Sequence, residues 1–337
     1  MKKQYRSIFL LLIVVLSLSL IGCKKNVGTA EDNPVKEEEA KEEKEKDETV
    51  EKTKIGISVV NLDNPFYSVI YQSISEEIEK SEDLLVVAKD PGGDAQKQEE
   101  QILEMIDGGI ELLFLSPVNW EEITPSLEAL KEAGVKVINV DSRVKETELT
   151  DAYIGSDNVT AGILIGEDMI KRFQEGGKIA IIETKGQNAI TDRMKGLEET
   201  IAKAEKGFEV VGRSSGLDYD SLKSYAKELL VANPDIDAII CGNDQMALAV
   251  NEGAKEAGNT KVEIYGVDGS PDSKKELIKE DTRIVATVAQ SPINMGKSAY
   301  KIARQMLEKE EYEKETLETV FLITKDNVDA YGADGWQ

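Results

Sequence analysis

The sequence of 337 residues contains no histidine and only two cysteines. Without histidine, the protein has neither an imidazole general base nor a histidine ligand for zinc. Two cysteines are too few for a disulfide framework or a cysteine-rich metal site. Aromatic residues make up 5% of the chain, which is low for an all-β or membrane protein. No nucleophile–base pair is visible, so we expect a protein that is not an enzyme and holds no metal or cofactor.

Positive charge is also scarce, because 41 Lys and Arg stand against 65 Asp and Glu and leave a formal net charge of −24. Proteins that bind the phosphate backbone gather Lys and Arg, so we exclude nucleic acid as a partner. The excess of acidic residues is best explained by general solubility. Hydrophobic residues form 40% of the chain, which is enough for sizeable cores, and its length suggests about two domains.

The first residues have the pattern of an export signal. Three basic residues precede an apolar run over 8–21, which ends at Gly22 and Cys23. The run is shorter than the roughly 20 residues that span a membrane and fits the core of a signal peptide. The order resembles the bacterial lipoprotein signal, in which residues 1–22 are removed and Cys23 is lipidated. The alternatives are an ordinary signal peptide and a short buried helix. We expect the lipid on Cys23 to hold the protein on the outer face of the cytoplasmic membrane, at a bacterial cell surface or in the periplasm.

The next segment, residues 24–53, contains almost no large apolar side chain and is rich in Glu and Lys. Such a segment buries too little surface to offset the entropy lost on ordering. We therefore predict that residues 23–53 form a lipidated cysteine followed by an acidic, disordered stalk. The folded body then begins near Lys54.

From Lys54 onward, short runs rich in Val and Ile alternate with longer segments whose apolar residues recur three and four positions apart. The runs predict strands over 55–60, 84–88, 112–115, 135–140, 179–182, 209–211, 238–241, 262–267 and 284–289. The longer segments predict helices over 66–81, 94–108, 123–133, 190–204, 221–232, 246–258 and 273–280. Continuously apolar strands indicate parallel sheets covered by helices on both faces. The predicted fold class is α/β, with two doubly wound parallel-sheet domains.

Polar residues follow five of these strands, at 61–67, 141–143, 242–244, 268–269 and 290–292. Each loop alone is explained by turn formation. Ligands of open parallel sheets bind at the carboxyl ends of the strands, so five such loops at one edge indicate a ligand site. Their Asp, Asn, Gln and Arg side chains mix donors and acceptors, as sugar hydroxyls require, and Phe66 and Tyr67 offer flat apolar faces. A paired-acid glycosidase is disfavoured because the carboxylates lie on different loops.

These loops also carry a family resemblance. Residues 54–325 resemble the ribose/galactose-type solute-binding proteins of sugar ABC transporters, and most of all their ribose-binding branch. The matching stretches are 64–67, 94–117, 140–141, 156–158, 193–196, 243–248, 266–269 and 286–290. The resemblance implies a type I periplasmic-binding-protein fold whose two domains are joined by a three-segment hinge near Ser156, Gln290 and Val320. It places an N-terminal lobe at 54–155 plus 291–319 and a C-terminal lobe at 156–290 plus 320–330.

The function implied is an extracytoplasmic solute-binding protein. It captures a monosaccharide, either a pentose or a hexose, in the interdomain cleft and delivers it to an ABC permease, acting as a monomer. The alternative is a surface sensor of a sugar or furanose signal that presents its closed form to a receptor kinase or chemoreceptor. The same fold also serves as the effector domain of repressor-type transcription factors. Such a protein would need a basic helix-turn-helix ahead of Lys54, where this chain has an acidic segment, so this alternative is disfavoured.

The resemblance also assigns ligand contacts residue by residue. They are Asn64, Phe66, Tyr67 and Asp141 of the first lobe, Arg193, Tyr219, Asn243 and Asp268 of the second, and Gln290 at a hinge crossing. The family's Arg after the strand-end Asp is replaced by Ser142, and Arg143, one position later, either reaches the ligand or faces solvent. A family hydroxyl is replaced by Val60. These departures disfavour ribose itself and leave another pentose, a hexose, a polyol or a furanose.

Overall fold

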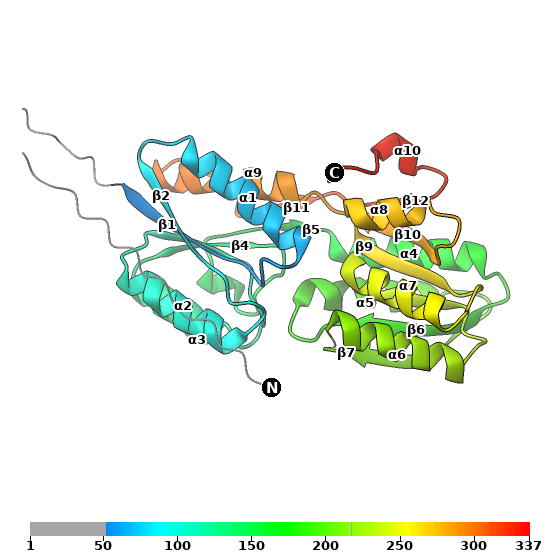
Figure 1. The fold of residues 1–337 in the computed structure, drawn as a ribbon. Helices are drawn as coiled ribbons and strands as arrows, with labels where there is room; N and C mark the ends of the chain where they lie inside the picture. Colours follow the sequence, from blue (N-terminus) through cyan, green and yellow to red (C-terminus); the bar gives the residue numbers. More distant parts are fainter. Residues whose placement is uncertain (1–51, 217) are drawn as a thin grey trace, which may run out of the picture. The chain divides into compact units, whose positions relative to one another are not determined.

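The computed structural model describes residues 52–216 and 218–337. The predicted signal peptide, Cys23 and the predicted stalk up to residue 51 lie outside the described residues. The described chain alternates strands and helices and builds two separate six-stranded sheets (Figure 1). Both sheets belong to one compact unit.

The first domain is built on a sheet with the strand order β11-β5-β4-β3-β1-β2. Its strands are β1 (Thr53–Ser58), β2 (Leu84–Lys89), β3 (Leu112–Leu115), β4 (Lys136–Val140), β5 (Ala152–Ser156) and β11 (Glu315–Glu318). Every neighbouring pair in this sheet is parallel. A short 3-10 helix, η1 (Thr147–Leu149), precedes β5.

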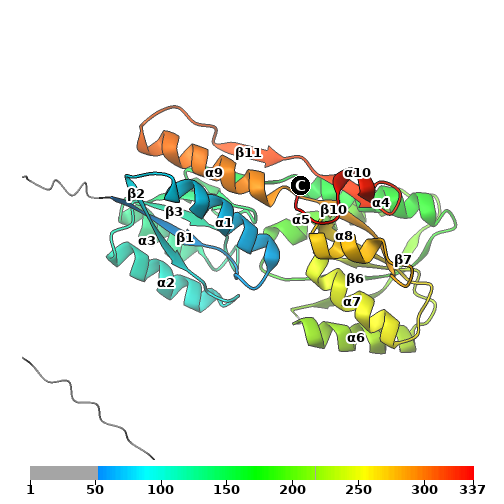
Figure 2. The same cartoon turned by 45° about the horizontal axis from the view of Figure 1, so that its top comes forward.

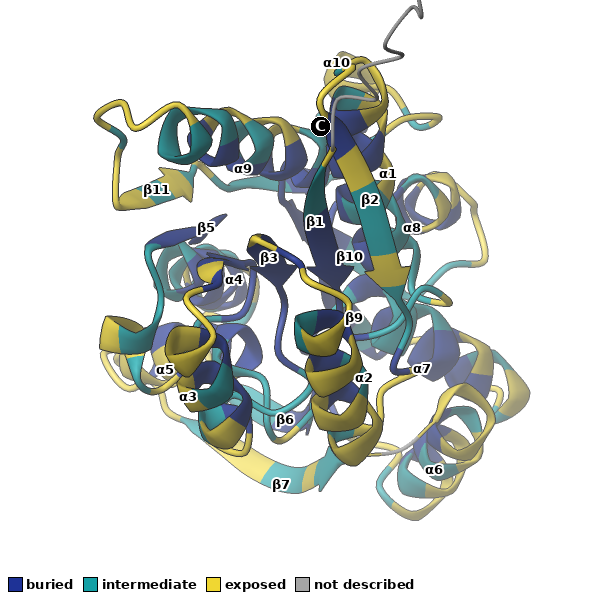
Figure 3. Cartoon of the chain, turned by 90° about the vertical axis from the view of Figure 1, so that its left-hand side faces the viewer, coloured by how far each residue is buried: buried dark blue, intermediate teal, exposed yellow. Residues whose placement is uncertain are grey.

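Helices cover both faces of this sheet, as the continuously apolar strands predict. Leu112 and Phe114 join the core under α1 (Pro65–Glu79) and α9 (Pro292–Leu307). The alternate residues Leu113 and Leu115 join the core under α2 (Ala95–Asp107) and α3 (Thr124–Glu132). Successive side chains of a strand point to opposite faces, so the two cores lie on opposite sides of the sheet. Figure 3 shows the central strands buried and the outward side of α2 exposed.

The second domain has the strand order β12-β10-β9-β8-β6-β7. Its strands are β6 (Gly177–Glu183), β7 (Phe208–Ser215), β8 (Ala238–Cys241), β9 (Glu263–Asp268), β10 (Ile284–Ala289) and β12 (Phe321–Thr324). The strands are parallel except for the edge strand β12, which runs antiparallel to β10. One face is covered by α4 (Asn158–Arg172) and α5 (Asn188–Ile201), the other by α6 (Tyr219–Ala232), α7 (Asp244–Glu256) and α8 (Pro271–Leu277).

Several helix ends follow from local side-chain chemistry. The Asp94 side chain accepts a hydrogen bond from the backbone N–H of Lys97 and caps the start of α2. After α2 and α3, Gly109 and Gly134 adopt φ values of +77° and +72°, which glycine reaches without steric cost. The glycines therefore mark the helix ends expected from the sequence.

The chain passes between the two domains three times. It leaves the first sheet after Ser156 for α4, returns between Ala289 of β10 and Pro292 of α9, and leaves again between β11 and β12. The predicted fold class, two doubly wound α/β domains joined by three segments, is confirmed. In the part of the chain that the structure describes, no helix has both the length and the apolar character needed to cross a membrane.

Candidate ligand-binding cleft

A cavity lies where loops of the two domains meet. It is lined by Asn64, Phe66, Tyr67, Asp141, Gln187, Ala189, Arg193, Asn243 and Asp268. Parallel strands bring their carboxyl ends to one edge of a sheet, and most of these side chains end or follow a strand or begin the helix after it, while Arg193 lies in the second turn of α5. The structure therefore brings together seven of the ten residues that the sequence resemblance assigned to the ligand.

Loops of the two domains touch each other around the cavity. The backbone N–H of Trp120, after β3, donates to the carbonyl of Gly186, after β6, at 2.8 Å. The N–H of Ala189 donates to Oγ of Ser142 at 3.3 Å. These contacts join loops of both sheets, so the candidate ligand-binding side chains of the two domains face the same space.

On the first-domain side, the start of α1 presents two aromatic rings. Asn64 caps this helix by accepting a hydrogen bond from the N–H of Phe66 at 3.0 Å. The rings of Phe66 and Tyr67 meet edge to face, with centroids 5.6 Å apart. Both rings are buried, so the cap and the ring contact together fix an apolar surface beside the cavity.

Asp141 supplies the carboxylate of the first domain. It directly follows β4 and adopts a φ of +66°, a left-handed conformation that is uncommon outside glycine. Its carbonyl accepts a hydrogen bond from Oη of Tyr153 at 2.7 Å, and its Oδ2 accepts one from Oη of Tyr67 at 3.0 Å. Among the described residues no group donates to its buried Oδ1. This oxygen is an acceptor directed at the site.

On the second-domain side, Arg193 of α5 is 3% exposed. Its Nε donates to Oδ1 of Asn158 at 2.8 Å and its Nη1 to the carbonyl of Gly242 at 2.7 Å, which fixes the guanidinium plane. The position of Arg193 depends on the close packing of α4 against α5, which meet at Gly162 and Gly196. A Cβ on Gly162 would lie 1.9 Å from the carbonyl oxygen of Arg193. Small residues at this crossing are therefore required to hold the arginine in place.

Asp268 and Gln290 form a pair at the edge of the second sheet. Nε2 of Gln290 donates to Oδ1 of Asp268 at 2.8 Å, and the Gln290 backbone N–H donates to the Asp268 carbonyl at 3.0 Å. Asp268 adopts a φ of +137°, which is strained for a residue with a side chain. Gln290 does not line the cavity itself, but its Oε1 is buried without a donor among the described residues.

Burial dominates the electrostatics of the site. It raises the pKa of Asp141, an effect that the nearby Arg193 guanidinium opposes. It raises the pKa of Asp268 well above its usual range, and the charge of the neighbouring Asp244 adds to this rise. Burial also raises the pKa of Asp244 to about 6. Burial thus already disfavours negative charge on these acids, so an anionic ligand would add a charge that the site stabilises poorly.

Sequence reasoning missed two residues that line the cavity, Gln187 and Ala189. Oη of Tyr67 donates to Oε1 of Gln187 at 3.5 Å, a long hydrogen bond between the two domains. Both residues follow β6, whose strand was predicted. The rule that ligands lie after parallel strands could have found them, had it been applied to this strand as well.

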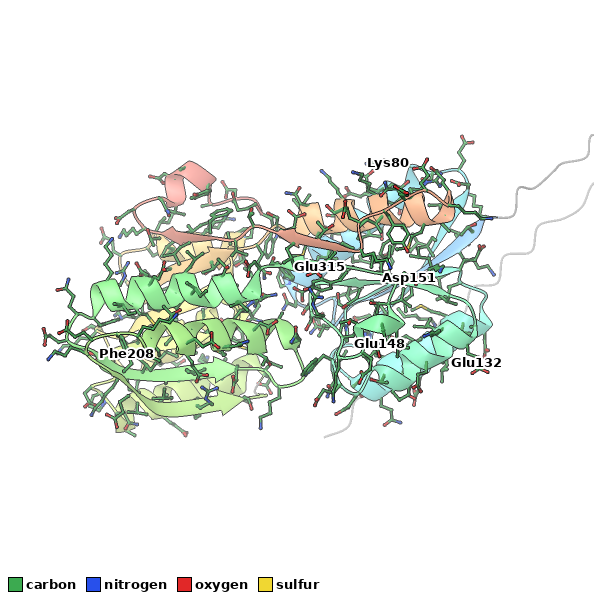
Figure 4. All side chains as sticks on the ribbon, turned by 180° about the vertical axis from the view of Figure 1, so that it is seen from behind. Lys80, Glu132, Glu148, Asp151, Phe208 and Glu315 are labelled. Atoms are coloured by element: carbon green, nitrogen blue, oxygen red, sulfur yellow. The ribbon has the colours of Figure 1, made fainter. Side chains whose placement is uncertain are left out.

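Tyr219 and Arg143 lie away from the cavity lining. Tyr219 begins α6, is 39% exposed, and donates to Oε1 of Glu252 at 3.1 Å. Arg143 stacks over the ring of Tyr153 at 3.9 Å and pairs with Glu315 of β11 at 2.6 Å. Figure 4 labels Glu315 on β11, seen from behind. Arg143 is therefore half-buried, and its guanidinium is held by this stack and ion pair.

Two α/β domains joined by three segments, with polar groups of both converging on one cavity, define the class of two-lobed ligand-binding proteins. Residues 55–311 match the family described as periplasmic binding protein domain. The chain belongs to this family, and the family resemblance drawn from the sequence is confirmed.

Curated relatives and solved structures agree with this assignment. The ribose import binding protein RbsB of Bacillus subtilis (strain 168) is 30% identical over 256 residues, which are 75% of this chain and 81% of the relative. The D-allose-binding periplasmic protein of Escherichia coli (strain K12) is 33% identical over 257 residues, 72% of this chain and 80% of the relative. A solute-binding protein of an ABC transporter from Mycobacterium smegmatis, with bound glycerol, is 28% identical with a TM-score of 0.76, covering 83% of this chain and 96% of that one. One from Bacillus halodurans C-125, with bound myo-inositol, shares the fold at 24% identity and a TM-score of 0.77, covering 84% and 98%.

Proposed function

We propose that this protein is an extracytoplasmic solute-binding protein that captures a monosaccharide between its two domains and delivers it to an ABC permease. The observation that carries the proposal is the set of side chains around the cavity, which is itself small, about 10 Å³. Carboxylate, amide and guanidinium groups of both domains converge there beside two aromatic rings. The relatives that bind ribose or allose by name support a sugar as the ligand.

The polar groups match the hydrogen bonding of a polyol. Each sugar hydroxyl both donates and accepts hydrogen bonds. Among the described residues, no group donates to the buried Oδ1 of Asp141 or Oε1 of Gln290, so both oxygens can accept from a hydroxyl. Arg193 can only donate. The rings of Phe66 and Tyr67 offer an apolar surface to the C–H face of a sugar. The proposed ligand contacts are Asn64, Phe66, Tyr67, Asp141, Gln187, Arg193, Asn243, Asp268 and Gln290.

The charge of the site favours a neutral ligand over an anionic one. A sugar acid would bring its carboxylate next to Asp141 and Asp268, which are already buried at an energetic cost. A neutral sugar instead donates hydroxyl protons to these oxygens without adding charge. This argument selects the class of ligand and leaves open which pentose, hexose or polyol binds.

The mechanism we propose is closure of two lobes, residues 54–155 plus 291–319 and residues 156–290 plus 320–330, about the three connecting segments. A ligand held by both lobes stabilises the closed arrangement, because each lobe alone satisfies only part of its hydroxyls. Closure also removes water, which strengthens hydrogen bonds to groups such as Asp141 and Arg193. The permease would recognise the closed form, and no chemical step on the sugar is required.

Transport is favoured over signal sensing. The curated relatives are described as an import binding protein and a periplasmic binding protein. Uptake of labelled sugar by cells that lack the protein separates the two roles: a transport protein is needed for uptake, whereas a sensor is needed only for the response.

We also propose that Cys23 carries the lipid that keeps the protein at the outer face of the cytoplasmic membrane. The support is the order of basic, apolar and small residues before this cysteine. Cell fractionation tests it: wild-type protein is expected in the membrane fraction and Cys23→Ser protein in the soluble fraction. Equal distribution of the two proteins would refute the lipid anchor.

The binding function is tested by a thermal-shift and calorimetric panel of sugars on the purified protein. A ligand at about 100 times its dissociation constant should stabilise the protein by about 2.7 kcal/mol, a clearly measurable shift. At least one neutral monosaccharide or polyol should bind, and the matching sugar acid should not. A panel in which no carbohydrate binds would refute the proposal.

A further inference from the structure

The last residues of the chain cross from the second domain to the first. Their starting point is α10 (Val328–Tyr331), which is rooted in the second domain. Val328 is buried in the core of that domain, and the ring of Tyr331 stacks on Phe321 of β12 with centroids 4.6 Å apart. Trp336, five residues further on, packs against the core of the first domain. In Figures 1 and 2 the marked C-terminus lies between the α1 side and the α8 side of the chain.

The contact of Trp336 in the first domain is with a residue that lines the cavity. Its ring meets the Phe66 ring edge-on, with centroids 5.9 Å apart and an interplanar angle of 63°. Phe66 meets Tyr67 in the same manner at 5.6 Å. The Phe66 ring is therefore held by two aromatic neighbours, one from its own helix and one from the C-terminus of the chain.

The segment is also held on its other side by a buried lysine of the second domain. Lys274 lies on α8, the helix that follows Asp268, and its side chain is fully buried. Its Nζ donates to the carbonyl of Gly335 at 2.6 Å. Burying an ammonium group is costly unless it is paired or hydrogen-bonded, so this bond compensates the burial and fixes the backbone next to Trp336. Lys275 adds an exposed ion pair with Asp334 at 3.3 Å.

We propose that residues 332–337 form a strap between the domains, in which Trp336 is a positioning residue for ligand binding. The strap joins α8, which follows Asp268, to the helix start that carries Asn64, Phe66 and Tyr67. It orients the Phe66 ring toward the ligand and stabilises the arrangement in which both domains face the cavity. The inference rests on the proposed sugar-binding function and adds a noncovalent link to the three covalent crossings.

The strap is tested by calorimetric and kinetic titration of the sugar found in the panel. Trp336→Ala in the full chain should raise the dissociation constant about 2- to 10-fold, the range expected for one aromatic pair, mainly through faster dissociation. Trp336→Phe should restore most of the affinity. Lys274→Met, which removes the bond to Gly335 and retains an unbranched side chain, should weaken binding in the same direction.

Phe208→Ala is the matched control. It removes an edge-to-face aromatic pair with Phe173 inside the second domain, at a place that contacts neither the strap nor the cavity lining. It should leave the dissociation constant unchanged within error. If Trp336→Ala lowers only the melting temperature and leaves affinity and dissociation rate equal to wild type, the residue is merely structural and the inference is overturned.

Hydrogen exchange of the ligand-free protein separates this inference from the proposed function. The N–H of Ser68 donates to the carbonyl of Asn64 in the first turn of α1. Loss of Trp336 should speed exchange in this turn, although the substitution lies at the other end of the chain. Unchanged exchange there would overturn the strap. Failure of every sugar to bind wild-type protein would refute the proposed function while leaving this result interpretable.

Discussion

The two sides of the cavity contribute in different ways. The first domain offers two aromatic rings and one carboxylate, Asp141, whose free oxygen faces the site. The second domain offers a buried guanidinium fixed by two hydrogen bonds and a strained carboxylate, Asp268, near a second buried acid. The first side therefore provides an apolar surface and one hydrogen-bond acceptor. The second side provides buried ionisable groups, whose burial lowers the stability of the folded protein. We therefore expect the proposed ligand to contact both sides.

The largest effect should come from the charge on the second side. Arg193→Met removes the guanidinium that faces Asp141 and Asp268 and leaves the hydrogen-bond acceptors of Asn158 and Gly242 without a donor. We expect sugar affinity to fall at least about 30-fold and the free energy of unfolding to fall by about 3 kcal/mol. Calorimetry and urea denaturation measure the two effects. Arg193→Lys keeps the charge and should be intermediate; a fully active Arg193→Met protein would contradict the account.

The two carboxylates allow a matched comparison across the cavity. Asp141→Asn and Asp268→Asn keep size and one oxygen acceptor, so each should weaken binding about 10-fold, as expected for a hydrogen bond to a charged group. Neither should destabilise the ligand-free protein, because burial already penalises both charges. Calorimetric affinities and melting temperatures provide the check. Loss of affinity from only one of the two would show that the ligand does not bridge the domains.

The pH dependence of stability should be dominated by the second side. Burial raises the pKa of Asp244 to about 6 and that of Asp268 well above its usual range. The folded state therefore binds protons more tightly than the unfolded state, so stability should fall as pH rises from about 4 through 6, by about 3 kcal/mol for Asp244 alone. Urea denaturation over this range measures the slope. Asp268→Asn should flatten it more than Asp141→Asn does; an equal effect would remove the distinction between the two sides.

The smallest effects should come from Tyr219 and Arg143, two of the three expected ligand residues that lie outside the cavity lining. Tyr219→Ala and Arg143→Met remove contacts to Glu252 and Glu315 and should change the dissociation constant less than about twofold, since exposed pairs contribute little. Phe66→Leu serves as the comparison and should weaken binding about 3- to 10-fold. Titration of the three variants side by side tests this. A large loss in Tyr219→Ala would mean that the second domain also supplies a ring to the ligand.

Much of the fold follows from short-range signals in the sequence. The cap at Asp94 and the glycine at position 134 act within one turn of their helices, so they could be read without the tertiary structure. The polar residues after parallel strands were also predictable, because topology alone brings Asp141 and Asp268 to a sheet edge. Predicting that both residues line one cavity also required the family resemblance, which indicates that the two sheet edges face each other.

Other features depend on contacts that no local pattern encodes. Helix α4 carries Gly162 and Gly166, which lower helix propensity, and both are needed because α5 packs against them. Strands β11 and β12 are only four residues long. The sheet that each of them joins is decided by where the chain crosses between the domains. The position of Tyr219 depends on the loop after the edge strand β7, and that of Trp336 on α8. Such placements follow from packing across the whole domain.

The most direct test of the central claim is a crystal structure of the protein with the sugar found in the panel. The account predicts one neutral sugar in the cavity, with hydroxyls bonded to Asp141 from the first domain and to Arg193 or Asp268 from the second. A sugar bonded by side chains of a single domain, or bound elsewhere on the protein, would contradict it.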